Sequence, residues 1–292
     1  MPDLTRRQLI RRAVFGLGGA GLLGGGMATA QAYAPAQLNV HVAPLAGLQA
    51  PLQVALLTDL HYGPYIHTAQ VRGWVERTRS ARPDLILLAG DLLDERMRGP
   101  ADLLLAELGR LSAPLGVYAV WGNHDYGYFG RYGNARRGPA NPDWARERTR
   151  LQAQLAEAGI RVLTNQGVSV RPDLYVAGVD DLSWGEPAVG AALQAAPAGS
   201  ATLLMTHNPD LLPQLPAGLG LTVCGHTHGG QVRFPLIGAP VVPSRYGQRF
   251  AQGWIHDPVR AFVSRGLGVS GLPVRNLCPS EVVLLKLQPT HA

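Results

Sequence analysis

The segment PLQVALLTDLH, residues 51–61, passes through apolar residues and ends in Asp59-Leu60-His61. Its apolar run is too short for most helices and has the length of a buried β-strand. Because side chains alternate along an extended chain, Asp59 and His61 project to the same side. The segment therefore predicts a buried strand that presents two polar side chains at its carboxyl end.

Four further segments repeat this pattern of an apolar run followed by polar residues. They are PDLILLAGDLLD (83–94), LGVYAVWGNHDY (115–126), ATLLMTHNPD (201–210) and LGLTVCGHTHGG (219–230). Between these segments, helical patterns lie over about residues 68–80, 101–111, 144–158 and 187–196. Alternating strands and helices predict an α/β domain.

Polar residues at the carboxyl ends of strands are where α/β sheets place their sites. Their carboxylate, amide and imidazole groups suit divalent transition metals, and the absence of CxxC pairs argues against a structural zinc site. Glycines before Asp91, Asn123 and His226 allow the backbone to turn close to an ion. One such motif alone is usually a turn or a core histidine, but packing does not readily explain five in one chain.

The composition describes a globular protein with a sizeable core. The chain has 292 residues, of which 46% are hydrophobic and 16% are charged. Of the formal charge of +6, four arginines and one aspartate place +3 in the first 34 residues. The remaining +3 is too small to indicate a nucleic-acid-binding face. Cys224 and Cys278 are expected to be two thiols, with a single bridge as the alternative.

Residues 1–34 have the layout of a targeting segment. A twin arginine in TRRQLI precedes a glycine-rich apolar run over residues 13–28, and small residues then offer cleavage sites ending at Ala30, Ala32 or Ala34. The segment resembles a twin-arginine (Tat) signal, with an N-terminal anchor helix as the alternative. It predicts export by the Tat translocase to the periplasm, the cell wall or the outer face of the cytoplasmic membrane. Residues 35–50 are expected to be a linker, and 51–290 the main domain.

The ordered motifs over about residues 50–290 resemble the calcineurin-like metallophosphoesterase superfamily. GHTHGGQVRFPLIG, PSRYGQRFAQG, VSRGLGVSGLPVR and CPSEVVLL resemble its YkuE/YaeI-like branch of exported or membrane-associated phosphoesterases. The resemblance implies an α/β fold with a four-layer α/β/β/α sandwich of two mixed sheets. It also implies two bound divalent cations; Mn²⁺, Fe²⁺ or Fe³⁺, Zn²⁺, Co²⁺ and Ni²⁺ all remain open. The protein is expected to be a monomer.

The same resemblance implies a role for each motif residue. One metal would be bound by Asp59, His61 and His228. The other would be bound by Asn123, His207 and His226, and Asp91 would bridge the two. His124 would reach the substrate phosphate, with Asp125 orienting it. This set implies hydrolysis of phosphodiester or phosphomonoester bonds through a metal-bridging hydroxide, with His124 protonating the leaving oxygen.

The substrate is less well defined by the sequence. Tyr126, Tyr128, Arg131, Arg233 and Arg245 follow the motifs closely and are candidates for substrate binding, although a solvated loop would also explain the first three. The leader favours a cell-envelope substrate, such as a phospholipid head group or cell-wall polymer, and allows membrane-surface association. The alternatives are a UDP-2,3-diacylglucosamine diphosphatase-like lipid A enzyme, which an export signal disfavours, and a non-catalytic metal-binding envelope protein.

Overall fold

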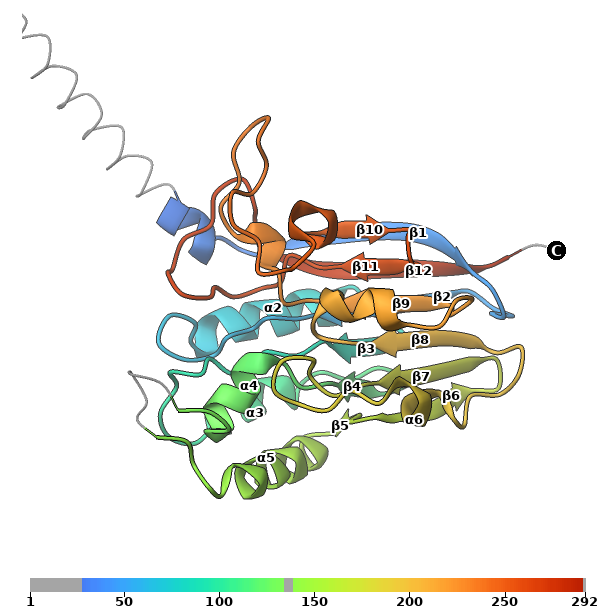
Figure 1. Ribbon diagram of the computed structural model, residues 1–292, viewed down its shortest axis with the longest axis horizontal. Helices are drawn as coiled ribbons and strands as arrows, with labels where there is room; N and C mark the ends of the chain where they lie inside the picture. Colours follow the sequence, from blue (N-terminus) through green and yellow to red (C-terminus); the bar gives the residue numbers. More distant parts are fainter. Residues whose placement is uncertain (1–27, 134–138, 291–292) are drawn as a thin grey trace, which may run out of the picture.

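Two six-stranded sheets lie face to face in the computed structural model, which describes residues 28–133 and 139–290 (Figure 1). The first sheet has the order β1 (Gln37–Leu45), β12 (Glu281–Pro289), β2 (Leu52–Leu57), β3 (Leu85–Leu88), β4 (Val117–Ala119) and β5 (Ile160–Val162). The second has the order β10 (Gly253–Ile255), β11 (Ala261–Val263), β9 (Leu221–Cys224), β8 (Ala201–Met205), β7 (Leu174–Gly178) and β6 (Gln166–Arg171). Both sheets are mixed, because β12 is antiparallel to β2, β6 to β7, and β10 to β11.

The helices connect the strands largely where the periodicity predicts them. They are α2 (Thr68–Ser80), α3 (Asp102–Leu108), α4 (Asn123–Phe129), α5 (Trp144–Glu157) and α6 (Val189–Leu193). Helix α6 is shorter than the expected range over residues 187–196; it contains Gly190, which weakens a helix, and Pro187 and Pro197 stand on either side of it. Helix α4 was not predicted, because its first residues belong to the GNHD motif at the end of a strand.

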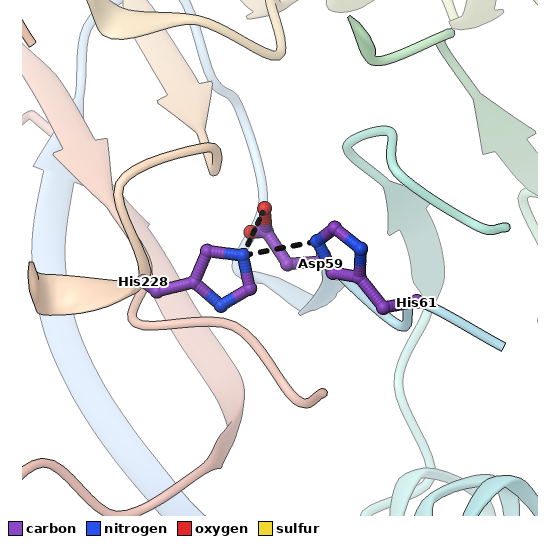
Figure 2. A group of neighbouring side chains, drawn as sticks. All are labelled: Asp59, His61 and His228. Carbon is purple, nitrogen blue, oxygen red and sulfur yellow. Dashed lines mark hydrogen bonds and ion pairs between the residues drawn. The ribbon is translucent and has the colours of Figure 1, made fainter. Parts of the chain in front are cut away.

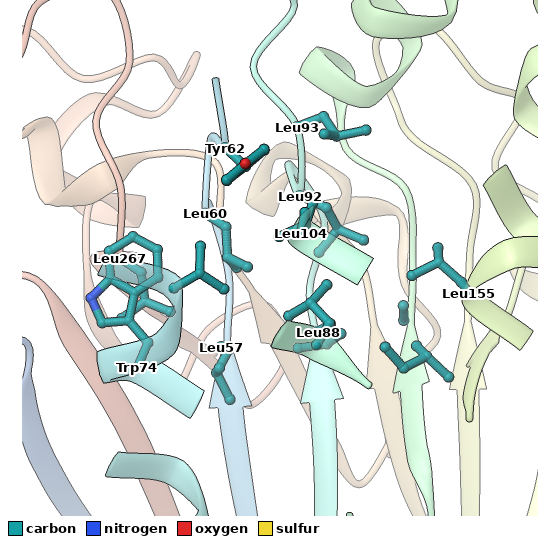
Figure 3. Packing of buried hydrophobic residues seen from close by; sticks show 14 of the residues in the cluster. Leu57, Leu60, Tyr62, Trp74, Leu88, Leu92, Leu93, Leu104, Leu155 and Leu267 are labelled. Carbon is teal, nitrogen blue, oxygen red and sulfur yellow. The ribbon is translucent and has the colours of Figure 1, made fainter. Parts of the chain in front are cut away.

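Alternating side chains divide the core into three layers. Val54 and Leu56 of β2 pack between the two sheets. Ala55 and Leu57 face the other way, onto the layer of α2, α3, α4 and α5 (Figure 3). A third cluster packs α6 and short 3₁₀ turns against the outer face of the second sheet. The four-layer α/β/β/α arrangement implied by the sequence is therefore confirmed.

The expected linker over residues 35–50 is wrong for most of its length. Strand β1 pairs in parallel with β12 from Gln37, opposite Glu281, to Leu45, opposite Pro289. The strand lies at the edge of the sheet and leaves Val40 and Val42 exposed, so its apolar residues give little sign of a core element. Most of the expected leader, residues 1–27, lies outside the described residues. Within the described ranges, no helix is long and apolar enough to span a membrane.

The topology brings distant motifs to one end of the molecule. Strands β2, β3 and β4 are parallel neighbours in the first sheet, and β7, β8 and β9 are parallel neighbours in the second. Their carboxyl ends point to the left in Figure 1, where the loops that follow them meet. This end of the sandwich carries all five sequence motifs.

Candidate metal centre

The loops after five strands bring seven predicted ligands together. Asp59 and His61 follow β2, Asp91 follows β3, and Asn123 begins α4 after β4. From the second sheet, His207 follows β8, and His226 and His228 follow β9. Their atoms form two groups able to hold a metal ion, one of Asp59, His61 and His228 and one of Asp91, His207 and His226, and His61 and Asp91 form a third such group with His124.

The first group joins residues of both sheets (Figure 2). His228 Nε2 lies 3.4 Å from Asp59 Oδ1 and 3.0 Å from His61 Nε2. Ligand atoms that share one ion at about 2.0–2.2 Å lie about 3.0–3.5 Å from one another. The three side chains therefore have the spacing of ligands to a single cation.

Asp91 lies between the two groups. Its Oδ2 is 3.4 Å from His61 Nε2 and 3.2 Å from His207 Nε2. Its Oδ1 accepts a hydrogen bond of 2.8 Å from the backbone N–H of His124, which holds the carboxylate in place. An oxygen within reach of ligands on both sides has the position of a bridging ligand.

The second group contains His207 and His226, whose Nε2 and Nδ1 atoms are 3.3 Å apart. The amide oxygen of Asn123, the residue expected to complete this group, is buried and has no hydrogen-bond partner among the described residues. A buried polar atom without a partner is costly unless a ligand satisfies it. The orphaned oxygen fits the expected role of Asn123 as a metal ligand.

The protonation of the histidines also fits cation binding. Burial lowers the pKa of His61 and of His226, each to about 3, so both rings are neutral, as metal ligands must be. Burial alone would lower the pKa of His207 too, but Asp91 and Asp59 raise it to about 10. His207 Nδ1 lies 2.8 Å from the carbonyl oxygen of Ala89, so its donation there leaves Nε2 to face Asp91. A cation at that point competes with the proton on Nε2.

Five ligand residues adopt an unfavourable backbone conformation with positive φ. Asp59, His61, Asp91, His226 and His228 all have φ between 49° and 72°. Non-glycine residues rarely adopt this region, at a cost of about 1–3 kcal/mol each. Five strained residues that converge on one point indicate that the loops are shaped for binding and not for stability alone.

Glycines allow the close approach that the sequence predicted before three of the ligands. A Cβ atom on Gly122 would lie 2.2 Å from Asp91 Oδ1. One on Gly225 would lie 2.0 Å from Thr58 Oγ1, and one on Gly90 would lie 2.7 Å from His207 Nδ1. No other residue type fits these positions without displacing a ligand or its neighbour.

His124 lies at the edge of the centre. Its ring centroid is 4.6 Å from that of His61, and its Nε2 is 3.5 Å from Ser270 Oγ. The prediction that Asp125 orients His124 is wrong. The Asp125 carboxylate instead accepts hydrogen bonds of 2.9 Å from the backbone N–H groups of Leu93 and Gly122, because its position in the first turn of α4 directs it back toward the helix start. Burial and the nearby Asp91 raise the pKa of Asp125 to about 8.

Asp181, which follows β7, was not predicted from the sequence. Its carboxylate is buried, and Oδ2 accepts hydrogen bonds from the N–H groups of Ser183 and Trp184, while Oδ1 has no partner among the described residues. Burial raises the pKa of Asp181 to about 6. A signal was present, because LYVAG is also an apolar run followed closely by two acidic residues. Ser270 was missed as well, although it lies within the segment VSRGLGVSGLPVR.

The candidate substrate residues after the GNHD motif turn toward other partners. Tyr126 is fully buried, and its hydroxyl donates to Asp180 Oδ1 at 2.6 Å and accepts from Arg148 at 3.0 Å. The Tyr128 hydroxyl donates to the carbonyl of Gly99 at 3.0 Å. The Arg131 guanidinium stacks on Trp144 at 4.3 Å from the ring centroid. These contacts give the three residues structural roles in and around α4.

Arg245 is better placed than these residues. With His226, Ser183 and Asn208 it lines a polar cavity of about 570 Å³ beside the second metal group. Arg233 donates to the carbonyl of Gly229 at 2.9 Å, next to His228. Cys224 and Cys278 are both free and buried, so the alternative of a disulfide bridge is wrong.

Comparison with known proteins agrees with this geometry. Residues 52–230 match the calcineurin-like phosphoesterase family. The chain is 26% identical to the uncharacterized metallophosphoesterase YkuE of Bacillus subtilis over the whole of both chains. It is 29% identical to the phosphodiesterase YaeI of Escherichia coli over 82% of this chain and 83% of that one. It is 30% identical to a putative metallophosphoesterase of Caenorhabditis elegans over 81% of this chain, which spans 48% of that protein.

A solved dimetal phosphatase from Danio rerio is similar at 15% identity, with a TM-score of 0.45 over 76% of this chain and 89% of that one. The family match covers the ligand loops after all five strands, from Asp59 to His228. The chain therefore belongs to the calcineurin-like phosphoesterase family and is a metal-dependent phosphoric ester hydrolase.

Proposed function

We propose that the protein hydrolyses phosphodiester bonds at a centre that holds two divalent cations. The position of Asp91 Oδ2, 3.4 Å from His61 and 3.2 Å from His207, carries this proposal, because it joins two ligand groups into one site. When bound, the two cations lower the pKa of a coordinated water and neutralise charge on phosphoryl oxygens. The relative YaeI of Escherichia coli is a phosphodiesterase by name, which favours diesters over monoesters.

The chain's own groups supply the remaining functions. His124 lies beside the first group on a short helix whose start is fixed by the Asp125 carboxylate. Its imidazole is the candidate to hold a proton and deliver it to the leaving oxygen. The cavity lined by Arg245 and Ser183 offers a polar space for the leaving group next to His226.

We further propose that the substrate belongs to the cell envelope and that the protein reaches it through the Tat translocase. The support is the twin arginine, the glycine-rich apolar run and the small residues of the leader. Replacing both arginines, Arg6→Lys with Arg7→Lys, should block export. Unchanged export of that variant would exclude the Tat route.

The catalytic proposal is tested with protein reconstituted with Mn²⁺, Zn²⁺ or Fe²⁺. Bis-p-nitrophenyl phosphate, p-nitrophenyl phosphate and a UDP-linked lipid analogue are assayed in parallel. We expect metal-dependent hydrolysis that is faster for the diester than for the monoester. Cleavage of the UDP-linked analogue alone would replace the proposed function with a pyrophosphatase, and metal binding without any hydrolysis would indicate a binding protein.

A further inference from the structure

Exposed apolar side chains gather on two neighbouring loops near the metal centre. We name these residues the apolar rim: Phe234, Leu236, Ile237, Val241, Leu272 and Leu277. Twelve large hydrophobic residues are exposed in the described chain, and six of them belong to this rim. Leu236 is fully exposed, and Leu272 is 65% exposed. Such a concentration of apolar surface indicates a binding surface more often than chance exposure.

The two loops are tied together as one structure. Val232 and Asn276 form a β-bridge, and the N–H of Arg233 donates to the carbonyl of Asn276 at 2.9 Å. The Asn276 side chain donates in return to the carbonyl of Arg233 at 2.7 Å. The first loop also forms a tight turn in which Phe234 and Gly238 exchange backbone hydrogen bonds. These contacts fix the rim in its exposed position.

Two leucines of the rim occupy strained backbone positions. Leu236 has φ 69° and Leu277 has φ 48°, a region in which glycine or asparagine costs less than leucine. Both side chains are exposed, so packing against the protein does not offset this cost. Five of the eight other non-glycine residues with positive φ are metal ligands. Most of these other strained residues are therefore functional, and Leu236 and Leu277 have the same kind of backbone strain.

The rim lies next to the entrance of the metal centre. The first loop begins directly after the ligand His228, and the second contains Ser270, whose hydroxyl lies 3.5 Å from His124 Nε2. The Gln231 side chain joins the two loops by donating to the carbonyls of Ser270 and Leu272. A surface that covers the rim is thus brought close to His124.

The positive charge of the two loops and the position of the first described residues favour an anionic membrane surface as the partner of the rim. Residues 229–250 contain three arginines and residues 265–278 contain two, and neither segment contains an acidic residue. Arg275 is fully buried, and Arg249 and Arg265 form ion pairs with Asp257 and Glu281, so Arg233 and Arg245 are the arginines of these loops that remain to meet an anionic surface. The described chain begins at Ala28, whose carbonyl accepts a hydrogen bond of 2.9 Å from the N–H of Arg275 in the second loop. Ala28, which begins the helical turn over residues 28–33 (Figure 1), is therefore held against the second loop.

We propose that the apolar rim inserts into the head-group region of a bilayer that contains anionic lipids, so that the metal centre faces the membrane surface. Leucine, isoleucine and phenylalanine enter the boundary between head groups and acyl chains, while Arg233 and Arg245 contact anionic phosphates. This orientation suits a centre whose substrate is a phosphodiester at the lipid surface. Docking itself does not require that the centre hydrolyse such a bond.

The first experiment measures insertion directly in the full-length chain. Leu236→Cys is labelled with a thiol-reactive, environment-sensitive fluorophore; the native Cys224 and Cys278 are 0% exposed and do not compete. Leu103→Cys on α3, where the leucine is 63% exposed, is the matched control. With vesicles of phosphatidylglycerol and phosphatidylcholine, we expect a blue shift and increased emission at position 236 only. An unchanged probe at 236 on vesicle-bound protein, or equal changes at both positions, would overturn the proposal.

A second experiment removes the apolar groups and relieves the backbone strain. Leu236→Asn combined with Leu277→Asn should weaken binding to the same vesicles by about tenfold or more. Its melting temperature should stay level or rise, and hydrolysis of a soluble diester should be unchanged, as for the control Leu103→Asn. Because all variants share the leader, the difference isolates the rim. Equal vesicle binding by the double variant would contradict docking, as would a signal at 236 that rises with protein concentration without lipid.

Discussion

At the residue scale, His124 and Asp125 are neighbours with separate tasks. His124 lies at the edge of the ligand groups, whereas Asp125 fixes the start of α4 through two backbone N–H groups. The sequence correctly indicated which residue types gather here. It could not reveal that the Asp125 carboxylate turns back toward Gly122, because hydrogen bonds to the backbone depend on the dihedral angles of the chain.

Replacing His124 with alanine should separate catalysis from metal binding. We expect His124→Ala to keep two metal ions per chain and to lose about 10²–10⁴-fold in kcat, since proton delivery to the leaving oxygen is removed. Metal content by elemental analysis and steady-state kinetics measure the two effects. His256→Ala at an exposed position is the control. Loss of a metal ion from the His124 variant would show that this histidine is a ligand.

Asp91 should couple the two metal positions. Asp91→Asn removes the charge shared by His61 and His207, so we expect both metal affinities to fall together. Isothermal titration with Mn²⁺ measures this change without relying on activity. The same substitution at the exposed Asp257 should leave both affinities intact. If only one of the two sites weakened, the bridging role would be wrong.

At the scale of elements, the turn from β4 into α4 depends on Gly122. A Cβ atom there would lie 2.2 Å from Asp91 Oδ1 and 2.5 Å from Asp91 N, so Gly122→Ala should displace the Asp91 loop. We expect lower metal content and a loss of roughly 2–4 kcal/mol in the free energy of unfolding from overpacking and lost hydrogen bonds. Urea denaturation and elemental analysis measure both changes.

Gly73 provides the control for this substitution. It lies within α2, and a Cβ atom added there meets nothing within 4 Å. Gly73→Ala should therefore raise the free energy of unfolding by about 0.5–1 kcal/mol, because alanine favours the helix. A Gly122 variant that behaved like the Gly73 variant would mean that the ligand loop tolerates the added methyl group.

Elements whose side chains are buried were easier to predict from the sequence than elements at the edges of the sheets. Strands β2, β3, β4, β8 and β9 are nearly continuous apolar runs, and α2 matches its predicted range over residues 68–80. Strands β1 and β10 were missed because they lie at the edges of their sheets. Strand β11 was missed because its apolar run is only three residues long, whereas the run that contains β4 extends over residues 115–121. Long, buried elements therefore define the part of the fold that periodicity can reveal.

At the scale of the whole molecule, the metal centre joins the two sheets. Asp59, His61, Asp91 and Asn123 come from the first sheet, and His207, His226 and His228 from the second. The sequence indicated these ligands as strand ends, but their convergence depends on how the sheets pack, which no local pattern encodes. The position of Asp181 could not be predicted for the same reason. It interacts electrostatically with His207 because β7, which precedes it, pairs with β8.

Because the ligands span both sheets, bound cations should stabilise the whole domain. A ligand at 100 times its Kd adds about 2.7 kcal/mol to the free energy of unfolding, which raises the Tm of a chain of this size by roughly 5–10 °C for one site. We therefore expect chelation with EDTA to lower the Tm by at least this amount and added Mn²⁺ to restore it, as measured by calorimetry. Asp91→Asn should respond much less, since it holds little metal to lose. An unchanged Tm of the native protein after verified metal removal would mean that packing between the sheets, and not the centre, holds them together.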